Sequence, residues 1–108
     1  NYGHAMFPPR TWRNCYYDMS WIPLLSPPLA RHVLSMAIDI IPANKILMGT
    51  DCGSPESFLG TARLIRRLIV EVLEEKMRAD QFGLAVAKSL AKSLLHDNAC
   101  EFFNLQDA

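Results

Sequence analysis

Two apolar patterns alternate along this chain: short continuous runs, and longer stretches in which apolar residues recur at helical spacing. The short runs occupy residues 15–21 and 45–51, and turn residues or prolines flank them. Runs of this kind are typical of strands. The second run ends in the polar Asp51, shortly before Gly53. This indicates a buried parallel strand whose last residue emerges into a loop.

A first helix is predicted between the two strands. Residues 22–28 form a proline-punctuated loop, in which Ser26 and Pro27 supply a hydroxyl cap and a first-turn proline. The helix is expected to run to about Ile41, because Pro42 cannot continue it. Its core-facing positions are Leu29, Val33, Met36, Ala37 and Ile40.

Three further helices follow the second strand. The order Ser54, Pro55, Glu56 repeats the cap, proline and acidic first-turn pattern, and predicts a long helix over residues 56–78. Its apolar stripe holds Phe58, Ala62, Ile65, Ile69 and Val72, widened by Leu68 and Leu73.

After a break near residues 79–81, a helix is expected over residues 83–95, with Leu84, Ala87, Leu90, Ala91 and Leu94 in register. Asp97 or Asn98 would cap a last helix over residues 99–105.

The resulting order predicts a mostly helical α/β fold with two parallel strands and three to four helices. Two strands joined by a crossover helix are expected to be parallel, with a right-handed connection. Strands that alternate with helices, one of them ending in an aspartate, suggest a segment of a (β/α) barrel. Residues 14–105 would form this module, and residues 1–13 an irregular lead-in.

Composition and charge narrow the class of function. Half of the 108 residues are apolar, and 11 basic residues balance 11 acidic ones, so the chain lacks the basic surface of a nucleic-acid-binding protein. No apolar run approaches the roughly 20 residues that cross a bilayer. Cys15, Cys52 and Cys100 are widely spaced, which favours neither a structural zinc site nor disulfides and predicts a reducing, cytoplasmic setting.

Three segments resemble the amidohydrolase superfamily, in the branch related to uronate isomerases and glutamine-synthetase-associated domains. Residues 14–20 (NCYYDMS) are similar to its "NVYLDLS" strand, residues 45–51 (KILMGTD) to its "KILFGTD" strand, and residues 98–105 (NACEFFNL) to its C-terminal "NAxxLFxL" helix. The resemblance covers residues 14–105, roughly the last third of such a barrel, whose usual length is about 250 residues.

The resemblance implies a hydrolase that uses one or two divalent metal ions, usually zinc. In that family the aspartate of the final strand ligates metal and accepts a proton from the attacking water, and Asp51 is its counterpart here. His4 is a second candidate ligand, although the ten residues between it and Cys15 leave no room for the helix that the family has there. The family's other metal ligands have no counterpart, so no cofactor is expected in the isolated chain.

Other polar residues have simpler explanations than catalysis. Asp18 and Ser20 are expected to form strand-end hydrogen bonds, and Cys52 to be a buried thiol. His32 is expected on a helix surface, and His96 near a helix C-terminus, where a cation is favourable. Arg67 and Glu71, like Glu74 and Arg78, are spaced as i,i+4 ion pairs on a solvated helix face.

Two function hypotheses follow. In the first, the chain is a truncated amidohydrolase-like module without catalysis of its own, which self-associates because a two-stranded parallel sheet leaves both edges open. In the second, it is the C-terminal part of a working metal-dependent hydrolase of amide, ester or related bonds, whose other ligands lie on absent sequence. The expected partner is a second copy in the first case and the missing barrel segment in the second, with neither nucleic acid nor a membrane as partner.

Overall fold

Two short parallel strands lie between the helices of this fold. The computed structural model describes residues 2–105, in which β1 (Tyr17–Asp18) pairs in parallel with β2 (Ile46–Leu47). Tyr17 lies opposite Ile46, and the Met19 amide donates to the Leu47 carbonyl at 2.9 Å. The predicted parallel pair and the α/β class are therefore confirmed, whereas each strand is shorter than its predicted run. The barrel origin of the pair stays a prediction.

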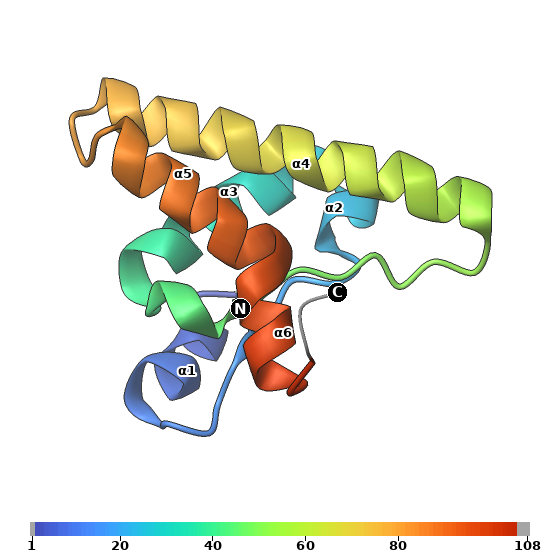
Figure 1. The fold of residues 1–108 in the computed structure, drawn as a ribbon, viewed down its shortest axis with the longest axis horizontal. Coiled ribbons are helices and arrows are strands. Elements are labelled where there is room, and N and C mark those ends of the chain that lie inside the picture. Colours follow the sequence, from blue (N-terminus) through green and yellow to red (C-terminus); the bar gives the residue numbers. More distant parts are fainter. Residues whose placement is uncertain (1, 106–108) are drawn as a thin grey trace.

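Helices make up most of the described chain (Figure 1). The long α4 lies across the molecule, α5 returns antiparallel to it, and α3 packs against α4 on the far side in this view. The helical elements are η1 (His4–Met6), α1 (Phe7–Thr11), α2 (Ile22–Leu25), α3 (Pro27–Ile40), η2 (Ala43–Lys45), α4 (Pro55–Arg78), α5 (Leu84–Lys92), the π-helical turn η3 (Ser93–Asp97) and α6 (Asn98–Phe102).

The two long helices begin where their sequences predict. The Ser26 hydroxyl accepts a hydrogen bond from the Leu29 amide at 3.3 Å at the start of α3. The Ser54 hydroxyl accepts one from the Ser57 amide at 3.2 Å at the start of α4. Each serine satisfies an amide that has no partner within the helix.

The first residues of the chain are more ordered than we expected. Within the lead-in over residues 1–13, η1 and α1 are helical, and Met6 and Pro9 are buried. The Lys45 ammonium donates to the carbonyls of Pro9 at 2.9 Å and Trp12 at 2.6 Å. A cation at the C-terminal end of α1 satisfies carbonyls that have no partner within the helix, and this ties the lead-in to η2.

Two other local predictions are wrong. The expected loop over residues 22–28 contains α2, in which Ile22 and Pro23 are buried. The expected cap at Asp97 or Asn98 does not form, because both residues have helical dihedrals and α5, η3 and α6 run on without a break. Burial of the Ile22 side chain and of Asn98 overrides the local turn and cap preferences of these residues.

The core lies where α3, α4 and α5 meet the sheet. The predicted stripe of α4 is buried from Ile65 to Leu73, but Phe58 is 57% exposed, because the first turns of α4 extend beyond the other helices (Figure 1). Leu84 at the start of α5 is also exposed. An ion pair joins α3 to α4: the buried Lys76 ammonium lies 2.7 Å from the carboxylate of Asp39, whose side chain is half exposed.

Asn98 connects the C-terminal helix to the sheet. Its side chain is buried, and its amide nitrogen donates to the carbonyls of Ala43 at 2.6 Å and Ile46 at 2.9 Å. The Leu47 carbonyl faces β1, so the preceding carbonyl of Ile46 points to the outer edge of β2. Asn98 therefore covers the position where a further strand would bond.

We predict that Asn98→Ala lowers the free energy of unfolding by about 2–3 kcal/mol, because two buried carbonyls lose their donor. Asn44→Ala, at an exposed asparagine in the adjacent η2, is the matched control and should cost less than about 0.5 kcal/mol. Urea denaturation followed by circular dichroism measures both. Equal costs for the two variants would show that Asn98 does not hold α6 against β2.

Candidate functional site: the carboxyl ends of the two strands

Side chains that could do chemistry gather where β1 and β2 end. Because the strands are parallel, their carboxyl ends lie at the same edge of the sheet. We call this group, made of Asp18, Ser20, Trp21, Gly49 and Asp51, the strand-tip site. Sequence reasoning identified Asp51, Asp18 and Ser20, and missed the part that Trp21 and Gly49 play.

Asp18 and Ser20 form a tight turn that ends β1. One oxygen of the Asp18 carboxylate, Oδ1, accepts from the Ser20 amide at 2.9 Å and from the Ser20 hydroxyl at 2.7 Å. Aspartates commonly bond the backbone two residues on in this way. The expectation of strand-end hydrogen bonding at these residues is confirmed.

Gly49 lets the two strand ends approach each other. A Cβ atom placed on Gly49 would overlap the Ser20 hydroxyl oxygen and lie 3.4 Å from the Ser20 Cβ. The Ser20 hydroxyl cannot move freely, since Asp18 holds it. The glycine of the KILMGTD run therefore makes room for the turn at the end of the neighbouring strand.

Asp51 is exposed and already has a hydrogen-bond donor. Its Oδ2 oxygen accepts from the indole Nε1 of Trp21, which follows the end of β1. Both residues have positive φ angles, 47° for Asp51 and 73° for Trp21. Such a backbone is costly for a bulky side chain and persists where surrounding contacts hold it. The hydrogen bond between the Trp21 indole and the Asp51 carboxylate is such a contact.

Cys52 attaches the loop after Asp51 to α4. Its Sγ atom lies 3.3 Å from the Thr50 carbonyl and 3.2 Å from the Thr61 hydroxyl, which itself donates to the Ser57 carbonyl at 2.8 Å. Cys52 is half-buried rather than fully buried as expected. The thiol acts as a short polar link between the strand-tip loop and the first turns of the helix.

The strand-tip site does not fit the metal centre that the family resemblance implies. His4 is exposed in η1, near the start of the described chain. Among residues 2–105, no three histidine, cysteine, aspartate or glutamate side chains come together as metal ligands. A catalytic zinc needs about three protein ligands and a water, whereas this site offers separate carboxylates that already accept hydrogen bonds.

The other two histidines lie away from these groups on the helices. His32 is exposed on α3, as predicted. His96 lies in the π-helical turn rather than near a helix end, and its Nδ1 is 2.9 Å from the Asp97 carboxylate, with Cys100 Sγ 3.5 Å from Nε2. This contact with His96 holds the pKa of Asp97 below its ordinary value. The i,i+4 spacing of His96 and Cys100 is the sequence signal for this cluster.

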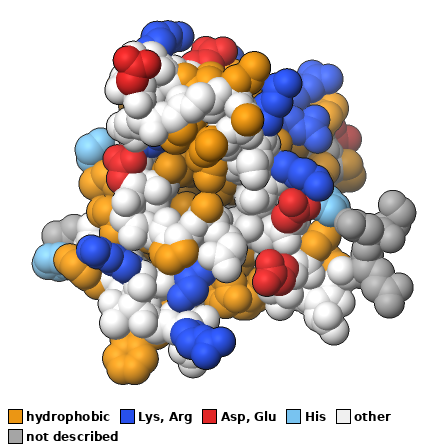
Figure 2. All heavy atoms as spheres, turned by 60° about the vertical axis from the view of Figure 1, so that its left-hand side comes forward, with side chains coloured by type: hydrophobic (Ala, Val, Ile, Leu, Met, Phe, Trp, Pro, Cys, Tyr) orange, Lys and Arg blue, Asp and Glu red, His pale blue; other side chains and the backbone are white. Residues whose placement is uncertain are grey.

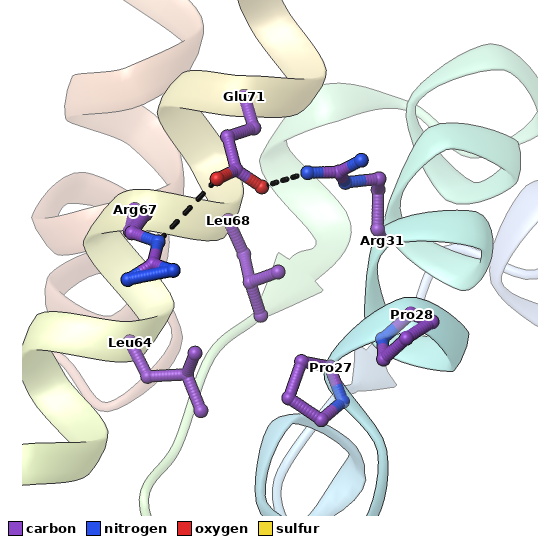
Figure 3. Close-up of a pocket in the computed structure, with 7 residues that line it drawn as sticks. All are labelled: Pro27, Pro28, Arg31, Leu64, Arg67, Leu68 and Glu71. Atoms are coloured by element: carbon purple, nitrogen blue, oxygen red, sulfur yellow. Dashed lines mark hydrogen bonds and ion pairs between the residues drawn. The ribbon is translucent and has the colours of Figure 1, made fainter.

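A shallow pocket lies between α3 and α4 (Figure 3). Its volume is about 260 Å³, and Glu71 accepts from Arg31 across the two helices and from Arg67, 3.4 Å away, along α4. The predicted i,i+4 pair is thus confirmed, and so is Glu74–Arg78 at 3.5 Å. The bond from Arg31 is the first cause that lowers the pKa of the Glu71 carboxyl. Arg31 comes from a distant part of the chain, so its contact had no sequence signal.

Comparison with models of protein families, with curated proteins and with solved structures found no match to this chain. The amidohydrolase resemblance therefore depends on the three motifs and their order. Within residues 2–105, no helix has both the length and the apolar character needed to cross a membrane. The cytoplasmic setting stays a prediction.

We predict that Gly49→Ala destabilises the fold by about 1–2 kcal/mol, because the new methyl group displaces the Ser20 hydroxyl from Asp18. In a Ser20→Ala background the obstructing oxygen is gone, so the same substitution should cost about 1 kcal/mol less. Chemical denaturation of the four proteins in this double-mutant cycle measures the difference. An identical cost in both backgrounds would mean that Gly49 is not required by Ser20.

A second prediction concerns acid stability. Since the pKa of Glu71 is lower in the folded chain than its ordinary value of 4.5, its stabilising effect is present at neutral pH. The effect is lost as the pH falls below 4.5 through the folded-state pKa. Glu71→Gln should therefore reduce the fall in melting temperature across this acid range, measured by circular dichroism. An equal fall in the wild type and in Glu71→Gln would contradict this role of Glu71.

Proposed function

We propose that this chain is an amidohydrolase-like module that self-associates and has no hydrolytic activity of its own. The observation that carries the proposal is the strand-tip site. Asp51, the counterpart of the family's metal-binding aspartate, accepts a hydrogen bond from Trp21 at the end of the neighbouring strand. In this arrangement the carboxylate has a structural role that needs no metal ion.

The chemistry of the two carboxylates supports the same view. Asp18 directs one oxygen at both the amide and the hydroxyl of Ser20, and Asp51 is bound by the indole. Among residues 2–105, the donors to these carboxylates are Ser20 and Trp21 rather than an imidazole. A hydrolytic metal lowers the pKa of bound water to about 7 only when several ligands fix it in a shaped, dry pocket. The side chains here stabilise the sheet end rather than hold a reactive water.

Self-association is supported by the apolar surface that the fold leaves uncovered. Val70 on α4 and Leu84 and Val86 on α5 are each about half exposed or more. Val70 and Leu84 line one stretch of surface between these helices, and contiguous apolar surface marks interaction sites in soluble proteins.

The second hypothesis, a part of a working metal-dependent hydrolase, is favoured by one observation. Asp51 is exposed at the carboxyl end of its strand, which is where barrel enzymes place their reacting groups. In that case further strands would supply the remaining ligands, and Trp21 would have to release the carboxylate before it could bind metal.

We predict that the purified chain binds no transition metal stoichiometrically and hydrolyses amide and ester substrates no faster than buffer. Calorimetric titration with Zn²⁺ and elemental analysis of the protein test the first part, and assays with chromogenic esters and amides test the second. Asp51→Asn should leave both results unchanged and alter the free energy of unfolding by less than about 1 kcal/mol.

Stoichiometric zinc that is lost in Asp51→Ala would contradict the proposal and support the hydrolase hypothesis. Trp21→Phe separates the two hypotheses further. It frees the Asp51 carboxylate while keeping an aromatic ring, so zinc binding that appears only in this variant would show that the indole blocks a usable metal ligand.

A further inference from the structure

An apolar groove runs between α4 and α5. It has a volume of about 210 Å³, and both helices contribute to it. Val70 and Leu84, on opposite sides, are each more than half exposed, while the small residues Ala87 and Ala91 form part of its wall. Figure 2, in which the turn between α4 and α5 comes forward, shows apolar side chains next to basic and acidic ones on this side of the molecule. The lining residues are Val70, Leu73, Glu74, Met77, Leu84, Ala87, Lys88 and Ala91.

The groove carries one charge of each sign, on opposite helices. Glu74 is on α4, where it also pairs with Arg78 at 3.5 Å, and Lys88 is on α5. Glu74 lies seven residues before Gln81, in the turn, and Lys88 lies seven residues after it. Because the helices are antiparallel around this turn (Figure 1) and have the same rise per residue, the two charges lie at about the same level along the groove.

We propose that this groove is the surface through which two copies of the chain pair, with their two-fold axis along the groove. This inference depends on the proposed self-association and adds its location. A two-fold axis in that direction places α4 of one copy on α5 of the other, at the same level. Glu74 of each copy then faces Lys88 of its partner, so one pairing gives two opposite-charge contacts.

The apolar side chains match under the same operation. Val70 is eleven residues before Gln81 and Ala91 is ten residues after it, so Val70 of one copy meets the small Ala91 of the other. Large residues opposite small ones allow two helix pairs to approach closely, as in a four-helix bundle. The groove is thus complementary to itself in shape as well as in charge.

The open sheet, our first reason to expect an oligomer, is a poorer interface. Each strand has only two residues, and Asn98 already bonds to the Ile46 carbonyl on the outer edge of β2. Strand addition there would give few hydrogen bonds and would have to displace a buried amide. The α4–α5 groove needs no rearrangement of the fold.

Charge reversal tests the proposed geometry. Glu74→Lys alone and Lys88→Glu alone each create two like-charge contacts across the dimer. Because two exposed ion pairs change from attraction to repulsion, each variant should raise the dissociation constant roughly tenfold. An equimolar mixture of the two variants restores both contacts in the mixed dimer. Sedimentation equilibrium should therefore show tighter association in the mixture than in either variant alone, and wild-type-like association in the double variant E74K/K88E.

A matched pair of apolar substitutions provides an independent test. Leu84→Asp places a charge in the groove, and Leu59→Asp places the same charge at an equally exposed leucine outside it. Leu84→Asp should raise the dissociation constant of the dimer tenfold or more, and Leu59→Asp should leave it unchanged. Thermal melting of both variants, followed by circular dichroism, confirms that the monomer still folds.

The outcomes separate the two proposals. A wild-type chain that sediments as a monomer at micromolar concentration would overturn self-association and this interface together. A wild-type dimer that is unaffected by Leu84→Asp and by both charge reversals would leave self-association standing and overturn the interface. Rescue in the mixture of single variants supports the contact between position 74 of one copy and position 88 of the other.

Discussion

The fold depends on one buried amide. The Asn98 side chain donates to the carbonyl of Ala43, which precedes β2, and to that of Ile46, which begins it. These bonds hold the C-terminal helix against a strand more than fifty residues earlier in the chain. Without them, a two-residue strand would have a buried outer edge with no donor, which costs about 1–3 kcal/mol per group. The π-helical turn just before Asn98 belongs to the same arrangement, since it lets one helical segment continue from α5 to the sheet.

In the strand-tip site, side-chain hydrogen bonds likewise hold the carboxyl ends of the two strands. Asp18 ends β1 by binding Ser20, Gly49 leaves space for that turn, and Trp21 binds Asp51 across the gap. Trp21 and Asp51 both adopt backbone conformations that L-residues rarely populate. Strain at such a position is commonly associated with function. Here the indole–carboxylate bond gives the strain a structural reason, in agreement with the proposal that the site is not catalytic.

Features set by neighbouring residues could be predicted from the sequence, and features set by distant ones could not. Both serine caps, the Asp18–Ser20 turn and the i,i+4 ion pairs depend on spacings of a few residues. The bond from Arg31 to Glu71, the anchoring of α1 by Lys45 and the burial of Asn98 each join segments more than thirty residues apart. Phe58 illustrates the limit: its helical spacing is correct, but its side chain is more than half exposed near the start of α4.

The same distinction applies to the surface. An amphipathic stripe in the sequence predicts that a helix buries one face, yet it does not say whether the covering surface belongs to the same chain. In α4 the answer changes from residue to residue, because Ile69 and Val72 are buried in the core whereas Val70 lines the α4–α5 groove and remains exposed. A groove with apolar walls, one acidic residue and one basic residue at the same level meets its own complement when it is turned about its long axis. A second copy of the chain is therefore the partner that we propose for this groove, because its own charges and apolar side chains match it.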